Sequence, residues 1–215
     1  MDSLSLMLFI SFAAPLLLEI YICEGKSKQL LIFLLVGTLV ALFCGEVNGI
    51  LSGLIYTSTD IFTSNVTPLV EELCKALPLL FYAFCFKPDR LTLLECSAMV
   101  GVGFAILENA FVLGGDPDMV TIPLAIIRGF GSGIMHAICT TSVGYALSFV
   151  HIRRKTFYSG SIAILAAASI YHAIYNMLVQ SYYPTIGFVL PCITCIPILA
   201  YITKTVKKES KQEQK

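Results

Sequence analysis

Seven long apolar stretches, separated by short polar segments, dominate this chain and limit what it can fold into. Each stretch reaches the roughly 20 apolar residues that a helix needs to cross a bilayer. Only 13% of the residues are charged, whereas soluble domains have about 25%. We therefore expect an all-α fold, a polytopic membrane helix bundle of about seven transmembrane helices. It would form a single domain over 1–203, followed by a basic tail at 204–215. The stretches cover approximately residues 4–22, 29–50, 67–86, 91–113, 120–150, 159–180 and 185–203.

The fifth stretch is too long for one crossing, because 31 helical residues would measure about 46 Å. The segment RGFGSGIMH interrupts it, with three glycines in five residues. Since glycine is unfavourable inside a helix, we expect an outer or re-entrant segment at 120–130. The crossing itself would then run from about 131 to 150.

The distribution of lysine and arginine predicts the orientation of the bundle. These residues fall in alternate connections and in the tail, whereas the connections 51–66, 114–119 and 181–184 contain none. Basic residues favour the cytoplasmic side of a membrane. We therefore expect the N-terminus outside and the C-terminus in the cytoplasm. The residues on the cytoplasmic side would be Lys26, Lys28, Lys87, Arg90, Arg153, Arg154, Lys155, Lys204, Lys207, Lys208, Lys211 and Lys215.

Four of the apolar stretches also carry ionisable or amide side chains, which are costly in hydrocarbon and are functional candidates by default. Counted from the predicted helix ends at 1.5 Å per residue, five of these side chains lie about 6–12 Å below the outer surface. They are Glu71, Glu108, His136, His172 and Asn176. A common depth in four helices predicts one polar cluster inside the bundle. Its candidate members are Glu71, Glu72, Lys75, Glu108, Asn109, Arg128, His136, Thr140, His172 and Asn176.

The spacing of these residues and their chemistry point to hydrolysis. Pairs four residues apart, such as His136 with Thr140 and His172 with Asn176, share one helix face, which can point at the bundle interior and hold water. A carboxylate can deprotonate water, histidine can act as acid, base or metal ligand, and an amide can stabilise an oxyanion. No serine or cysteine has an obvious nucleophile context. The pattern favours a water activated either by a metal or by a glutamate.

At these residues the chain resembles the PrsW family of intramembrane proteases. This family belongs to a larger group with the CAAX prenyl proteases and bacteriocin-processing membrane proteases. The segments EELCK at 71–75, FAILEN at 104–109, HAICT at 136–140 and HAIYN at 172–176 correspond to the family patterns. Those patterns are E-E-x-x-K, F-x-x-x-E-N, H-x-x-x-T and H-x-x-x-N. All four occur in the family order, each in a separate apolar stretch, and the resemblance covers roughly 65–180.

The resemblance implies an intramembrane endopeptidase that works in a stress response. PrsW-type proteins make the first cut in a membrane-spanning anti-sigma factor, near the extracytoplasmic face of the membrane. The expected partners are such a substrate and the lipid bilayer, with no nucleic acid, and the expected location is a bacterial plasma membrane.

The resemblance also implies roles for individual residues. Glu71 would activate the water, His172 and Asn176 would stabilise the tetrahedral oxyanion, and His136 would orient groups or share protons. Glu72 would be a second catalytic carboxylate or would fix a neighbouring helix. Glu108 stands where the prenyl proteases have a histidine. The supporting residues would be Lys75 as a counter-charge, Asn109, Arg128 and Thr140.

Two mechanisms remain open at this point. In one, Glu71 alone activates the water; in the other, the protein holds a metal ion, for which Zn²⁺ is the candidate. The metal ligands would then come from Glu71, Glu108, His136 and His172.

Three other functions are consistent with parts of the pattern. A CAAX-type prenyl peptidase would need its site on the cytoplasmic side, which opposes the predicted orientation. A proton or ion transporter would also bury Glu, His and Lys residues, but transporters often show repeats and broken helices. Only one glycine-rich interruption and no repeat is visible here. A seven-span receptor or scaffold would leave the common depth of the polar residues unexplained.

Overall fold

The computed structural model describes residues 3–55, 57–115, 120–151 and 154–213, and this part of the chain is helical without a strand. Arg153 and Lys215 of the predicted basic set lie outside the described residues. The elements are α1 (Ser3–Ile22), α2 (Gly25–Leu54), α3 (Thr59–Ile61), the π-helix η1 (Phe62–Val66), α4 (Thr67–Phe86), α5 (Arg90–Gly115), α6 (Ile122–Ile126), the π-helix η3 (Ile127–Ser132), α7 (Gly133–Leu147), α8 (Arg154–Val179) and α9 (Pro184–Glu213).

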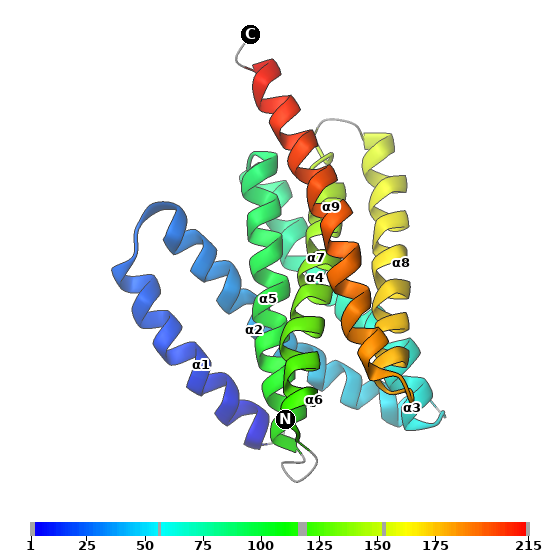
Figure 1. Cartoon of the computed structure of the whole chain (residues 1–215). Helices are drawn as coiled ribbons and strands as arrows, with labels where there is room; N and C mark the ends of the chain where they lie inside the picture. Colours follow the sequence, from blue (N-terminus) through cyan, green and yellow to red (C-terminus); the bar gives the residue numbers. More distant parts are fainter. Residues whose placement is uncertain (1–2, 56, 116–119, 152–153, 214–215) are drawn as a thin grey trace.

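The long helices run alternately up and down between two ends of the bundle (Figure 1). In that view α1 and α2 join at the upper left, below the upper ends of α5 and α8, whereas α9 ends at the top, and α8 and α9 join at the lower end. The α1–α2 hairpin leans away from the other helices, and α2 crosses behind α5.

Five helical segments of the described chain are long and apolar enough to cross a membrane, so the all-α membrane fold is confirmed at this level. Of the remaining two predicted spans, the first is represented by a shorter apolar helix, Leu6–Ile22. The other is α4, which carries Glu71, Glu72 and Lys75 in its first half. The count of seven and the orientation of the termini stay predictions. The five segments are Gly25–Leu54, Arg90–Gly115, Ile122–Leu147, Phe157–Val179 and Pro184–Ile202.

The glycine-rich segment does not interrupt the helix, so the predicted outer or re-entrant segment at 120–130 is wrong. The elements α6, η3 and α7 follow one another directly and form one helical segment of 26 residues, Ile122–Leu147. Gly129 and Gly131 fall in a π-helical stretch, a form that appears as a short bulge inside α-helices, and Gly133 begins α7. A Cβ atom on Gly131 would lie 3.3 Å from the hydroxyl of Tyr175 and 3.5 Å from the Cα atom of Phe188. This glycine therefore permits close helix packing instead of a break.

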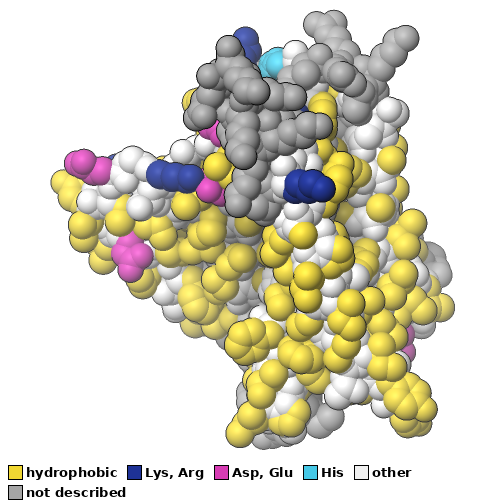
Figure 2. Space-filling view, turned by 45° about the horizontal axis from the view of Figure 1, so that its top comes forward, with side chains coloured by type: hydrophobic (Ala, Val, Ile, Leu, Met, Phe, Trp, Pro, Cys, Tyr) yellow, Lys and Arg dark blue, Asp and Glu magenta, His cyan; other side chains and the backbone are white. Residues whose placement is uncertain are grey.

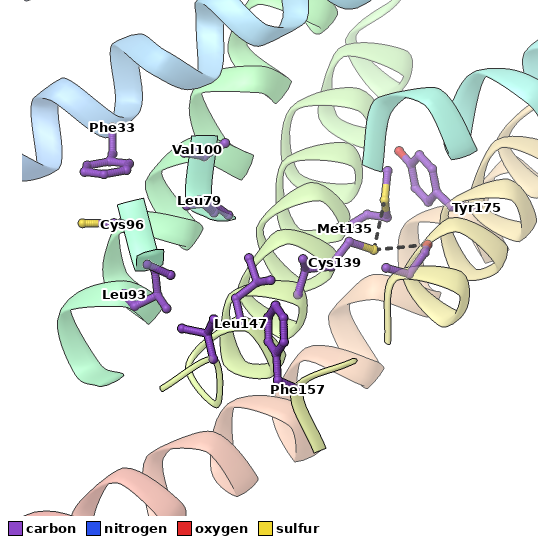
Figure 3. Packing of buried hydrophobic residues seen from close by; sticks show 14 residues of the cluster. Phe33, Leu79, Leu93, Cys96, Val100, Met135, Cys139, Leu147, Phe157 and Tyr175 are labelled. Carbon is purple, nitrogen blue, oxygen red and sulfur yellow. Dashed lines mark hydrogen bonds between the residues drawn. The ribbon is translucent and has the colours of Figure 1, made fainter. Parts of the chain in front are cut away.

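The apolar core joins the helices that carry the predicted polar residues. Buried side chains from α4, α5, α7 and α8 pack together, and Phe33 of α2 completes the cluster. Figure 3 shows Cys139 of α7 next to Met135 on its own helix. The Sγ atom of Cys139 lies 3.9 Å from the sulfur of Met135 and 3.7 Å from the carbonyl oxygen of Ala168 on α8. The core thus fixes how these helices stand relative to one another.

Glycines allow α5 to pack closely against two neighbours. A Cβ atom on Gly103 would overlap the carbonyl oxygen of Leu34 on α2, and one on Gly37 of α2 would overlap that of Val100. On the α7 side, a Cβ atom on Gly101 would lie 2.6 Å from the carbonyl oxygen of His136. Small residues at such contacts are typical of helix packing in membranes.

The outer surface of the bundle is apolar, as expected of a surface that faces lipid. Large hydrophobic side chains such as Leu18, Phe81, Ile162 and Ile196 are more than 60% exposed, at 68%, 62%, 70% and 72%. Figure 2 shows hydrophobic side chains over most of the visible face, with only a few charged ones. A soluble monomer rarely exposes apolar patches of this extent.

Candidate functional site

Most of the predicted polar residues meet in one buried network between α4, α5, η3, α7 and α8. Four of its side chains, Glu72, Lys75, His136 and His172, are at most 1% exposed. Glu71 is 5% and Arg128 is 8% exposed. The convergence that the sequence predicted from depth and spacing is therefore present in the structure.

Lys75 lies at the centre of the network. Its Nζ atom is 2.6 Å from Oε1 of Glu72 and 2.8 Å from Nδ1 of His136, and it lies 4.4 Å from the ring centre of Phe104. An ammonium group can only donate hydrogen bonds, so Nδ1 of His136 accepts. The lysine thus balances the charge of Glu72 and also determines which nitrogen of His136 carries the hydrogen.

His136 and Arg128 hold Glu108 from two sides. With Nδ1 as acceptor, the Nε2–H group of neutral His136 donates to Oε2 of Glu108 at 2.7 Å. The guanidinium group of Arg128 donates to the other oxygen at 2.8 Å. Arg128 and Asn109 bond reciprocally, at 3.1 Å through the Asn109 oxygen and at 2.9 Å through its amide. Glu108 and Asn109 therefore tie α5 to η3 and α7.

His172 faces Glu71 across a gap. Its Nδ1–H group donates to Oε1 of Glu72 at 3.0 Å, so neutral His172 presents a lone pair at Nε2. This atom lies 3.7 Å from Oε2 of Glu71, which is too long for a hydrogen bond. Among the described residues, neither of these two buried atoms has a hydrogen-bond partner. Two acceptors that face one gap are satisfied by a hydrogen donor or by a cation between them.

The same residues fit a metal ion. Glu71, His136 and His172 each offer one ligand atom, all within 4.8 Å of one another. One carboxylate with two imidazoles is a known donor set for Zn²⁺, and the bond from His172 to Glu72 is of the kind that orients metal-binding histidines. His136 could join only by releasing Lys75 or Glu108, since both its nitrogens are bonded. Glu108, the fourth predicted ligand, does not belong to this group.

A cavity of about 710 Å³ reaches the network from the lower end of the bundle. Its walls come from the second half of α2, from η1, from the start of α4 and from the ends of α5 and α8. Glu71, Glu108 and Arg128 line it, so the unpartnered oxygen of Glu71 belongs to a side chain on the cavity wall. A reacting chain can therefore reach this site through the cavity.

Two predicted residues lie apart from the central hydrogen bonds. Asn176 lines the cavity and donates from its amide to the carbonyl oxygen of Thr63 at 3.2 Å. Thr140 is buried, and its hydroxyl has no hydrogen-bond partner among the described residues. Their predicted roles, like those of the other site residues, stay predictions.

The sequence did not indicate that η1 and the glycines of α2 contribute to the cavity wall. Gly45 and Gly49 of α2 and Thr63 of η1 line it, although they carry no ionisable group. The signal that could have revealed this wall is the series of small residues four apart in α2, which is considered below.

A comparison with known protein families assigns most of the chain to one of them. A family model described as "PrsW family intramembrane metalloprotease" matches residues 26–202. No curated protein and no solved structure matches the chain. The matched range contains every residue of the network and of the cavity wall.

Proposed function

Because the chain belongs to the PrsW family of intramembrane proteases, we propose that Glu71 and His172 hold the reacting water of its peptidase site. The family match confirms the resemblance that four short motifs predicted. It makes the protein a peptidase and a multi-pass membrane protein whose substrate is another membrane protein.

The gap between Oε2 of Glu71 and Nε2 of His172 carries this proposal. A water molecule there can donate one hydrogen to each acceptor, which leaves its lone pairs free to attack a peptide carbonyl carbon. Glu71 is the general base in this arrangement, because a carboxylate within hydrogen-bond reach can take a proton from the attacking water. Glu72 keeps the imidazole of His172 in the orientation and tautomer that this geometry needs.

The structure leads to a revised division of roles between His172 and Asn176. Neutral His172 cannot donate from Nε2 until it takes up a proton, so it is not the first oxyanion donor. Asn176 carries an amide donor at the cavity wall, and we assign oxyanion stabilisation to it. His172 can then accept at Nε2 the proton that Glu71 took from the water and deliver it to the leaving amine as the C–N bond breaks, which leaves Glu71 as a carboxylate again.

A metal ion is consistent with the same site. Held by Glu71 and His172, with His136 as third ligand, Zn²⁺ would supply a Lewis acid that activates water and polarises the scissile carbonyl. Metal analysis of the purified protein separates the two mechanisms. If chelation removes the ion and the activity together, and Zn²⁺ restores both, the metal mechanism is supported. Full activity of the metal-free protein supports Glu71 alone.

We further propose that the substrate is a single-pass membrane protein, such as an anti-sigma factor in a bacterial plasma membrane, cut near its outer boundary as the first cleavage in a stress response. The cavity lies at the end of the bundle opposite to the α1–α2 connection. In the predicted orientation that end faces outward, which supports a cut on the extracytoplasmic side.

The test is to express the protein with a candidate single-pass substrate and to follow the appearance of the cut fragment. We expect each of Glu71→Ala, Glu108→Ala, His136→Ala and His172→Ala to abolish cleavage. Glu95→Ala is the matched control, because Glu95 pairs with Lys26 outside the network, and it should cleave like the wild type. If all four site variants still cleave, the proposed site is wrong.

A further inference from the structure

Helix α2 carries small residues at every fourth position over much of its length: Gly37, Ala41, Gly45, Gly49 and Gly53. The first is used within the bundle, because a Cβ atom on Gly37 would overlap the backbone of α5. At Gly45, Gly49 and Gly53 an added Cβ atom would meet nothing within 4 Å. The helix thus continues a pattern suited to close helix contact over a length where the described chain leaves open space next to these three glycines.

The open part of this pattern borders the cavity that holds the site. Ala41, Gly45, Gly49 and Ser52 line that cavity together with Glu71. We call these four residues of α2 the glycine face. Glu71, only 5% exposed, lines the same cavity and carries a buried oxygen atom without a partner among the described residues. On α2 itself, Oδ1 of Asn48 is likewise buried and unpartnered within the described chain, and Asn48 lines the cavity too.

The size of the cavity limits what can enter it. A 20-residue helix about 30 Å long and 10 Å across occupies about 2,400 Å³, more than all the open space of about 1,840 Å³ at the cavity. The cavity therefore admits a short, unwound segment, which is also the form that exposes a peptide carbonyl to attack. The rest of a membrane-spanning substrate has to stay at the open side of the cavity, against α2, where Gly45 and Gly49 are exposed.

We propose that the glycine face docks the transmembrane helix of the substrate, through small residues four apart on that helix, and so presents the adjoining unwound segment to Glu71. The inference rests on the proposed function. A face of small residues allows a second helix backbone to approach closely, and packing of this kind drives association in lipid. A lipid chain would gain no such advantage, and a second copy of the protein seated there would obstruct the cavity.

Binding of a defined probe tests the proposal without any need for cleavage. The full-length Glu71→Gln protein is placed in lipid nanodiscs with a labelled synthetic transmembrane helix, rich in leucine and alanine, that contains Gly-x-x-x-Gly. A matched peptide carries leucine in place of both glycines. We expect the glycine peptide to bind at least ten-fold more tightly, as measured by energy transfer. This preference should disappear in Gly45→Leu/Gly49→Leu.

Gly160→Leu is the matched control, since a Cβ atom on Gly160 of α8 also meets nothing within 4 Å, and it should keep the full preference. Gly45→Ala/Gly49→Ala is a milder second variant, expected to weaken the preference, in case the leucine variant does not fold. The proposal is overturned if the glycine peptide shows no preference, or if the preference survives in a folded double variant. It is also overturned if the double variant changes only bound lipid or self-association. Because the probe binds an inactive protein, a failure here is distinct from a failure of Glu71 as the base.

Discussion

At the scale of single residues, the main feature is a buried lysine whose role is electrostatic. The sequence predicted Lys75 as a counter-charge, and it shares a helix face with Glu71 four positions earlier. In the structure its hydrogen bond goes to Glu72, three positions earlier, and its other bond goes to His136. Glu71 keeps an oxygen without a partner in the described chain. The lysine thus stabilises the neighbour of the proposed base and leaves the base open to the cavity.

Lys75→Met should destabilise the protein strongly, because it leaves Glu72 buried without its cation. Breaking a buried ion pair in this way costs about 3–5 kcal/mol. The double variant Lys75→Met/Glu72→Gln should recover much of the loss, since neither buried charge remains. Thermal unfolding in detergent measures the loss of stability in Lys75→Met and its recovery in the double variant. Equal Tm values for the wild type and Lys75→Met would contradict this account of Lys75. The control is Lys26→Met, which removes the lysine of the exposed pair with Glu95 and should leave the Tm nearly unchanged.

The sequence predicted which residues would meet but not which atoms would bond. Spacing and depth were enough to bring together Glu71, Glu108, His136 and His172, because each lies at a similar distance from a helix end. The pairing of Lys75 with Glu72 instead of Glu71 goes together with the bond of Lys75 to His136 and the bond of Glu72 to His172. Neither of these is encoded in the local spacing of residues.

At the scale of helices, glycines set the contacts that hold the site together. Gly37 and Gly103 bring α2 and α5 into backbone contact, and Gly101 brings α5 against α7 next to His136. The same residue type misled the prediction for 120–130, where glycines were read as a break. Glycine both weakens helices and permits close packing, and only the neighbours Tyr175 and Phe188 show which effect decides at Gly131.

Gly103→Ala should therefore destabilise the bundle although alanine is the better helix former. The added methyl group would overlap the carbonyl oxygen of Leu34, and overpacking of this kind costs about 1–3 kcal/mol. Gly45→Ala on α2 meets open space and should be neutral or stabilising by up to about 1 kcal/mol. Denaturation in mixed micelles measures the free energy of unfolding of both variants. A lower stability for Gly45→Ala than for Gly103→Ala would show that the α2–α5 contact is not as described.

At the scale of the whole molecule, the alternating helix directions place the cavity at one end of the bundle. The C-terminal end of α9, which leads into the lysine-rich tail, lies at the other end (Figure 1). If the basic end is cytoplasmic, as the charge distribution predicts, the site opens outward, as required for a first cut on the outer side.

This orientation predicts the labelling of two engineered cysteines. Tyr182→Cys lies between α8 and α9, where the native side chain is 99% exposed, and it should react with an impermeant maleimide added outside intact cells. Lys204→Cys, near the opposite end of α9, should react only after the membrane is opened. The reverse pattern would put the cavity on the cytoplasmic side and would favour a peptidase of the CAAX type.

The central claim is that the oxygen of Glu71 that faces His172 activates the water for peptide hydrolysis. The most direct measurement is cleavage of a single-pass substrate by purified Glu71→Gln protein in nanodiscs, compared with wild type and with Glu95→Gln. The amide has the shape of the carboxylate but cannot act as a base, so we expect cleavage to fall by at least about a factor of 100, with folding unchanged. Glu95→Gln should retain wild-type activity. Cleavage by Glu71→Gln within a few-fold of the wild-type rate would contradict the claim.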